Sequence, residues 1–252
     1  MKNIVICGIG GKMGMKILET LQNFDDVTCV AGIDAYADKS RFSVPVFDKP
    51  QDINIKADVI VDFSRPEALD GLLSYAIENN VSLVLATTGY TKEQDDAVKA
   101  ASEKIAIFRA SNMSVGVNLL VHLCKKAAAI LGSGFDVEIV ETHHNKKVDS
   151  PSGTALTLAN AIKKEKEGSY LTFGRHGGDT KRKKDEIGVH AVRGGTIVGK
   201  HEVHFFGEDE VVTLTHEAHS KAVFAQGAIR AAAFIAKCKP GLYSMPDLVA
   251  SL

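Results

Sequence analysis

The sequence lacks several features that would commit a protein to a particular environment. Its four cysteines are far apart and form no C-x-x-C pair, which indicates reduced, packed thiols and not a disulfide framework or a zinc ribbon. The formal net charge is only −1, so we expect neither nucleic acid nor a membrane as a partner. We find no charged-then-apolar leader and no apolar run near the roughly 18–20 residues of a membrane span. A cytoplasmic protein is expected.

The composition is otherwise ordinary for a globular protein. Of the 252 residues, 45% are hydrophobic and 24% are charged, which supplies enough apolar material for a core. This length suits one large domain or two modest ones.

Strands and helices alternate through residues 1–113. Apolar runs predict strands at residues 3–7, 27–33, 58–62, 81–86 and 105–109, and helical periodicity predicts helices at residues 12–22, 66–78 and 92–102. This alternation predicts an N-terminal α/β domain of the Rossmann type, with a doubly wound parallel sheet.

The pattern changes after residue 113. We expect a helix at 116–131, a strand at 135–141, a helix at 154–164, and strands at 187–193, 196–206 and 210–216. Residues 168–184 are basic and glycine-rich and are expected to form a loop, whose role stays open. Residues 114–221 are therefore predicted to form an α+β domain with a mixed, mostly antiparallel sheet. The helix at 220–237 is expected to return to the first domain, so that 222–252 completes it.

A glycine-rich segment lies between the first strand and the first helix: Gly8, Ile9, Gly10, Gly11, Lys12, Met13 and Gly14. Glycines at this junction permit a tight turn and let backbone N–H groups approach a pyrophosphate at the helix N-terminus. Residues 1–113 are therefore predicted to bind a dinucleotide.

Asp34 ends the second strand, 20 residues beyond Gly14, where a carboxylate accepts hydrogen bonds from the adenosine ribose hydroxyls. It would repel a 2′-phosphate, and Ala35 follows it where an arginine could have offset that repulsion. We expect NADH to be preferred and NADPH to be used as well, since Lys12, Lys39 and Arg41 lie near in sequence.

Two further loops follow the fourth and fifth strands of the parallel sheet. Ligands of such sheets lie at the carboxyl ends of the strands. We therefore add the small residues of these loops to the candidate cofactor contacts: Ala86, Thr87, Thr88, Ala110, Ser111, Asn112 and Met113.

The most informative segment covers residues 138–155. A strand there ends in His143 and His144, and a short loop carries Lys146 and Lys147. Histidine and lysine can both donate protons near neutral pH. Adjacent strand residues face opposite sides, so a purely structural role for either histidine stays open. The two cannot easily share one ion and no cysteine is near, so no metal is expected.

A helix follows this loop, beginning at Ser152-Gly153-Thr154. The N–H groups of Gly153 and Thr154, with Ser152 as the cap, could hold a carboxylate. Proton donors and an anion site would then lie together.

With these residues identified, the chain closely resembles the 4-hydroxy-tetrahydrodipicolinate reductase (dihydrodipicolinate reductase) family nearly end to end. The blocks that carry the resemblance are GIGGKMG (8–14), DFSRPE (62–67), TTG (87–89), SNMSVGVN (111–118), ETHHNKKVDSPSGTA (141–155), EIGVHAVRGG (186–195) and VGKHEVHF (198–205).

The resemblance implies reduction of a cyclic imine dicarboxylate with a nicotinamide cofactor in lysine and diaminopimelate biosynthesis. It implies His143 and Lys147 as the proton-donating pair, with His144, Gly153 and Thr154 on the substrate. It also implies a homotetramer joined through the sheets of the second domain. The chain departs from the family pattern at Lys12, usually arginine, and at Met113, usually phenylalanine; neither change removes a catalytic group.

Two other functions are weighed against this one. A dehydrogenase of another small substrate would lack the 141–155 block, and a substrate panel would identify it. A non-catalytic redox sensor would keep the glycine loop and Asp34 but would have no need for His143 beside Lys147. Cofactor binding without turnover would indicate the sensor.

Overall fold

The computed structural model describes residues 1–251 and divides into two compact units. Unit 1 comprises Met1–Val115 together with the segment from Lys221 onward, and unit 2 comprises Gly116–Ser220. Each unit has its own sheet, with a hydrophobic core on each face of the sheet in unit 1 and a single core in unit 2.

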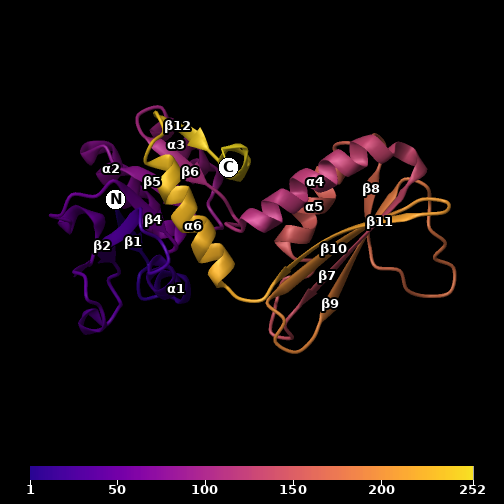
Figure 1. The fold of residues 1–252 in the computed structure, drawn as a ribbon, viewed down its shortest axis with the longest axis horizontal. Coiled ribbons are helices and arrows are strands. Elements are labelled where there is room, and N and C mark those ends of the chain that lie inside the picture. The colour runs from indigo at the N-terminus through magenta and orange to yellow at the C-terminus, as the bar shows by residue number, and fades with distance from the viewer. Residues whose placement is uncertain (252) are drawn as a thin grey trace. The chain divides into compact units, whose positions relative to one another are not determined.

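Unit 1 is built on a seven-stranded parallel sheet of order β12-β6-β5-β4-β1-β2-β3 (Figure 1). Its strands are β1 (Lys2–Cys7), β2 (Val27–Ile33), β3 (Val46–Phe47), β4 (Val59–Asp62), β5 (Ser82–Leu85), β6 (Ala106–Arg109) and β12 (Gly241–Tyr243). Side chains alternate between the faces, so Ile4 and Ile6 enter one core and Val5 and Cys7 enter the other.

Helices cover both faces of this sheet, which explains why its strands are apolar nearly throughout. On the Ile4 face lie α1 (Lys12–Leu21), α6 (Ala222–Ile235), which is yellow in Figure 1, and α7 (Met245–Ala250). On the Val5 face lie α2 (Leu69–Asn79) and α3 (Lys92–Ser102). The short helices η1 (Lys39–Arg41), η2 (Pro50–Asp52) and η3 (Pro66–Ala68) complete the connections. The doubly wound fold is confirmed.

Unit 2 contains a five-stranded sheet of order β11-β10-β7-β9-β8. Its strands are β7 (Asp136–His143), β8 (Tyr170–Phe173), β9 (Glu186–Arg193), β10 (Gly199–Phe206) and β11 (Val211–Ala218). The sheet is mixed, as predicted, but its pairings divide evenly: β10 is antiparallel to β7 and β11, and β9 is parallel to β7 and β8. The expectation of a continuous loop over 168–184 is wrong where β8 pairs with β9.

Helices cover only one face of this second sheet. The helices α4 (Val115–Leu131) and α5 (Gly153–Lys163) pack there on Val137 and Ile139 of β7 and their neighbours, and η4 (Gly132–Gly134) follows α4. The opposite face carries exposed apolar side chains, including Val192, Phe206 and Val211.

The segment 115–134 requires a correction, because by length and composition it could cross a membrane, and the sequence analysis counted no such run. This is weak evidence for a span. Leu120, Cys124 and Ala128 of α4 are buried in the core of unit 2, against the sheet. That packing accounts for part of the apolar composition, whereas Leu119, Leu123 and Ile130 of the same helix are exposed.

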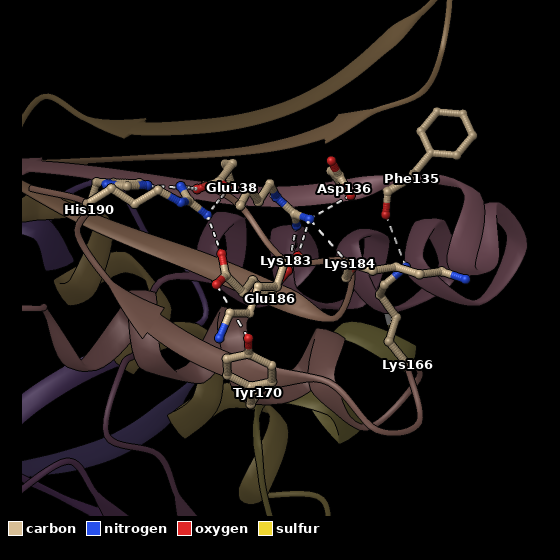
Figure 2. A network of polar contacts seen from close by, with 11 residues as sticks. Phe135, Asp136, Glu138, Lys166, Tyr170, Lys183, Lys184, Glu186 and His190 are labelled. Carbon is tan, nitrogen blue, oxygen red and sulfur yellow. Dashed lines mark hydrogen bonds and ion pairs between the residues drawn. The ribbon is translucent and has the colours of Figure 1, made fainter. Parts of the chain in front are cut away.

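Residues 174–185, the basic segment after β8, lie against the face of the second sheet that no helix covers. An ion-pair network holds them there, part of which Figure 2 shows around Glu138. Arg175 donates to Glu138 at 2.7 Å and to Glu186 at 3.0 Å, and Arg182 donates to Glu138 at 3.1 Å and to Asp136 at 2.6 Å. The charges of both arginines are therefore largely compensated inside unit 2.

Candidate active site

The glycine loop of unit 1 lies at the carboxyl end of β1, which pairs with β2 on one side and β4 on the other, so that the strand order of the parallel sheet reverses there. Gly8 has φ of +76°, and a side chain there would lie 2.8 Å from the carbonyl oxygen of Phe63. A side chain at Gly14 would lie 2.3 Å from the carbonyl oxygen of Gly8. Both positions therefore require glycine, one for the turn and one for packing of α1 on the loop.

Asp34 follows the neighbouring strand β2 and contacts this loop. Its carboxylate accepts hydrogen bonds from the backbone N–H groups of Gly10 and Tyr36, each at 3.0 Å. Beside it is a cleft of about 590 Å³. The lining includes four of the predicted cofactor residues, namely Gly8, Gly10, Gly11 and Asp34, and three residues the sequence analysis did not assign, namely Phe63, Ser64 and Arg65.

The other candidate cofactor residues of the glycine loop do not line this cleft. The side chain of Ile9 is fully buried beneath Gly32, so only its backbone could reach a ligand. Lys12 is exposed, and Met13 packs partly on the core. Lys39, which we considered for a 2′-phosphate, is paired with Asp48 at 2.7 Å.

The loops after β5 and β6 come together because these strands pair in parallel. Ala86 and Thr87 are buried at the end of β5. Thr88 is exposed beyond them, and Ala110 and Ser111 follow β6. The side-chain oxygen of Asn112 accepts from the N–H of Ser114 at 2.9 Å, and Met113 is buried against the parallel sheet.

In unit 2, the predicted proton donors lie at the end of β7. His143 is 8% exposed and Glu141, on the same face of the strand, is fully buried. The ring Nδ1 of His143 lies 2.5 Å from a carboxylate oxygen of Glu141. Lys147, in the following turn, is paired with Asp149 at 2.8 Å. His143 and Lys147 are therefore each paired with a different carboxylate.

Arg193, at the end of β9, completes the surroundings of Glu141. Its two terminal nitrogens each lie 2.7 Å from one oxygen of the Glu141 carboxylate. The N–H of Ser152 donates to the same carboxylate at 2.9 Å. Both oxygens of Glu141 are therefore satisfied within the protein, although the side chain has no exposed surface.

These contacts set the protonation of the pair. Burial alone would raise the pKa of Glu141, but hydrogen bonds from Arg193, His143 and the Ser152 N–H lower it, so the carboxylate stays ionised. Burial lowers the pKa of His143 below its ordinary value; Glu141 opposes this, and the charges of Lys147 and Arg193 add to it. A histidine with a lowered pKa is a stronger acid once protonated.

The start of α5 carries the predicted substrate residues. Ser152 caps the helix, accepting from the N–H of Ala155 at 3.1 Å, and its hydroxyl also lies 3.0 Å from Nε2 of His201. Ser152 is only 2% exposed, so its side chain stabilises the helix end from within. Gly153 is exposed and has no neighbouring atom within 4 Å of where a side chain would be, so the surface beside the start of the helix is open.

His144 follows the last residue of β7 and is partly buried. The N–H of His144 donates to the carbonyl of Ile197 at 2.8 Å, and its ring Nδ1 has no hydrogen-bond partner. In residues 1–251 no three histidine, cysteine or acidic side chains are grouped as metal ligands would be.

Sequence reasoning missed Glu141, Arg193 and His201 as site residues, although all three belong to the blocks that carry the resemblance. The available signal was the period of two in β7: Glu141 and His143 must share a face. Arg193 and His201 come from β9 and β10, and only the pairing of those strands with β7 brings them to the same place.

Comparison with known proteins agrees with this geometry. Family models described as dihydrodipicolinate reductase N-terminus and C-terminus match residues 2–113 and 116–249. The chain is 47% identical to a 4-hydroxy-tetrahydrodipicolinate reductase from Clostridium novyi, covering 100% of this chain and 99% of that protein. It is 45% identical to one from Caldanaerobacter subterraneus, covering 99% and 98%.

A solved structure is similar in fold over the same extent. The dipicolinate-bound dihydrodipicolinate reductase from Paenisporosarcina sp. TG-14 has a TM-score of 0.82 and 28% identity, with 97% of each chain covered.

Proposed function

This chain belongs to the dihydrodipicolinate reductase family, and we infer from its membership and its site that it reduces 4-hydroxy-tetrahydrodipicolinate to tetrahydrodipicolinate with a nicotinamide cofactor. It is an oxidoreductase of lysine and diaminopimelate biosynthesis. The observation that carries the inference within the structure is His143 on a buried, ionised Glu141, close to the start of α5.

The residues of unit 2 suit the proton half of this reaction. Conversion of the hydroxylated substrate to tetrahydrodipicolinate adds a hydride and a proton to the ring and releases the hydroxyl as water. The nicotinamide would supply the hydride. His143, with Nδ1 on Glu141, has Nε2 left for the proton, and the Lys147 ammonium can donate or restore it. We assign the pair as the catalytic acid on this basis.

The substrate carries two carboxylates, and two features of unit 2 complement them. The first backbone N–H groups of α5, at Gly153 and Thr154, suit one carboxylate. His144 and the lysine side chains of the turn suit the other. The role given to Ser152 becomes indirect, because its hydroxyl is already bound to Ala155 and His201.

The nicotinamide cofactor fits the cleft of unit 1. A side chain at Gly10 would meet Asp34 and Ala37 at 3.0 and 2.8 Å, so the backbone there is open only because it is glycine. Gly8, Gly10 and Gly11 would hold the pyrophosphate, and Asp34 would accept from the ribose hydroxyls. The loops at 86–88 and 110–113 stay our candidates for the nicotinamide end.

We expect NADH to be preferred over NADPH. Asp34 lines the cleft, and the nearby Lys39 is paired with Asp48, a second carboxylate that lines it. Arg65 also lines the cleft and gives a 2′-phosphate one favourable partner, so NADPH should still be used. Equal or higher catalytic efficiency with NADPH would contradict the role of Asp34.

We also propose a cytoplasmic homotetramer joined through the uncovered face of the second sheet. Val192, Phe206 and Val211 are 47%, 40% and 54% exposed on that face, and association would remove this apolar surface from water. Analytical ultracentrifugation tests this: a monomer at micromolar concentration would contradict it.

The decisive assay follows NADH absorbance after the purified protein meets the substrate made in situ by its synthase. Rapid oxidation is expected, and the same assay with NADPH gives the cofactor ratio. A folded protein that binds NADH but oxidises none of it would instead support a redox sensor, and oxidation with only a different small substrate would support another dehydrogenase.

A further inference from the structure

Glu141 is the most strongly fixed carboxylate in unit 2. It is fully buried, and it accepts from Arg193 through both oxygens, from the Ser152 N–H, and from His143. Arg193 is itself held, because it also donates to the carbonyl of Asp149 at 2.8 Å. The carboxylate therefore has one available position.

Stability alone does not explain such a pair. Removing two charges from water costs several kcal/mol per ion, and well-packed apolar residues of the same volume often stabilise a fold equally well. What an apolar pair cannot provide is an acceptor of fixed direction beside His143.

Resting on the proposed role of His143, we propose that Glu141, held by Arg193, is a positioning residue that keeps the proton on Nδ1 of His143 and leaves Nε2 as the atom that exchanges the proton with substrate. Glu141 acts through His143 and needs no contact with substrate.

The opposite side of the ring supports this assignment. A side chain at residue 199 would lie 2.9 Å from Nε2 of His143, so the glycine of β10 leaves room beside that atom. The ring of His201 meets the His143 ring edge-on at 5.1 Å between centroids. Glu141, Gly199 and His201 thus define the ring position from three directions.

Charge gives the proposal a testable direction. The groups that act on His143 are Glu141 on its own strand, Arg193 on β9, Lys147 in the following turn with its partner Asp149, and His201 on β10. Glu141 raises the pKa of His143 and Arg193 lowers it, so removal of either one should shift that pKa in opposite directions.

The experiment is a ¹³C and ¹⁵N histidine NMR titration of the full chain, with turnover measured in parallel. In Glu141→Gln, we expect the pKa of His143 to fall by roughly one pH unit and the Nε2–H tautomer to become populated. In Arg193→Gln, we expect that pKa to rise by a similar amount, and the double variant should lie between the two.

Turnover provides the second readout. The acidic limb of the pH profile should move in the same direction as the pKa in each variant, and kcat of Glu141→Gln should fall by roughly 10-fold or more. The KM for NADH should be unchanged, because Glu141 lies in unit 2. Glu141→Asp, which keeps the charge, should recover part of the lost kcat.

Glu138→Gln is the matched control. Glu138 lies on the same strand and is also paired with arginines, Arg175 and Arg182, but it faces the other side of the sheet. This variant should leave the titration and tautomer of His143 unchanged.

Shifts of both single variants in the same direction, or no shift in either, would overturn the proposal. Should Glu141→Gln not fold, Arg193→Lys and Glu141→Asp keep the charges and test the tautomer alone. Full turnover in His143→Ala would refute His143 as the proton donor. It would leave the result of the His143 titration in Glu141→Gln and Arg193→Gln unchanged. Loss of turnover in that variant, with no pKa shift in Glu141→Gln, would refute only this inference.

Discussion

At the scale of single residues, the two predicted proton donors are held differently. His143 rests on a carboxylate that is fully buried and fixed by an arginine, whereas Lys147 pairs with Asp149, whose side chain is 60% exposed. Water and salt weaken the second pair much more than the first. The histidine is therefore the more rigid partner.

Removal of either donor should damage turnover and spare the cofactor site. We expect His143→Ala and Lys147→Ala each to lower kcat by roughly 10²- to 10⁴-fold, which is the usual contribution of a positioned acid. NADH affinity, measured by fluorescence titration, should stay unchanged because its cleft is built by unit 1. Wild-type kcat in either variant would exclude that residue from proton transfer.

His201 should make stability depend on pH. Burial, followed by the charge of His143, lowers its pKa from 6.5 to about 4. Between these values the unfolded chain binds a proton at this residue that the folded chain does not, so stability falls as pH falls. The full effect is at most about 3 kcal/mol.

Urea unfolding at pH 6.5 and pH 4 checks this effect. In His201→Gln, the loss of unfolding free energy between the two pH values should be smaller than in the wild type. His204→Gln is the control, because His204 lies on the same strand but faces away and contacts Thr213. An equal change in both variants would contradict the assignment to His201.

The sequence could predict those site residues that lie close together along the chain, but not those that only the folded sheet brings together. The glycine loop, Asp34 and the 141–155 block are local patterns, so the sequence alone is enough to propose their residues as site residues. Arg193 and His201 are brought to Glu141 by pairings between strands, so their role requires the sheet register. Ile9 shows that a local motif can also mislead. It belongs to the glycine loop, yet its side chain is fully buried in the hydrophobic core.

At the scale of elements, the same division between local and distant causes applies. The expected start of α3 at residue 92 matches the structure, and Thr91 and Gln94 form a capping box there, a signal contained in four residues. The short strands β8 and β12 were not predicted, since each forms only through a partner distant in the sequence. The helix at Thr154 begins one residue earlier, at Gly153.

Helix α6 should be sensitive to a single methyl group. A side chain at Gly227 would lie 1.6 Å from the carbonyl oxygen of Met113, so Gly227→Ala must displace the helix or the candidate nicotinamide loop. We expect a loss of roughly 1–3 kcal/mol of unfolding free energy or more, with weaker NADH binding.

Gly71→Ala in α2 is the matched control. The nearest atom to a side chain there is 3.8 Å away, and alanine is the better helix former. This variant should be neutral or gain up to about 1 kcal/mol. Thermal unfolding of both variants is the measurement, and equal melting temperatures would contradict the proposed packing.

At the scale of the whole molecule, ligand contacts should separate by unit. NADH should slow amide hydrogen exchange in residues 8–14 of unit 1, where backbone N–H groups face the pyrophosphate. Dipicolinate, used as a substrate analogue, should instead protect residues 143–154 of unit 2. Hydrogen exchange with mass spectrometry measures both. Protection by dipicolinate confined to residues 8–14 would contradict the placement of the substrate site.

The discontinuity of unit 1 has a consequence for synthesis. Residues 116–220 form a continuous segment, so a ribosome can release all of unit 2 before it makes α6 and β12. Until α6 emerges, the Ile4 face of the parallel sheet lacks one of its covering helices, and β6 lacks a partner on one edge. The nascent chain then exposes apolar surface of the kind that chaperones bind. The first half of the chain to be translated is therefore the last to become a complete domain.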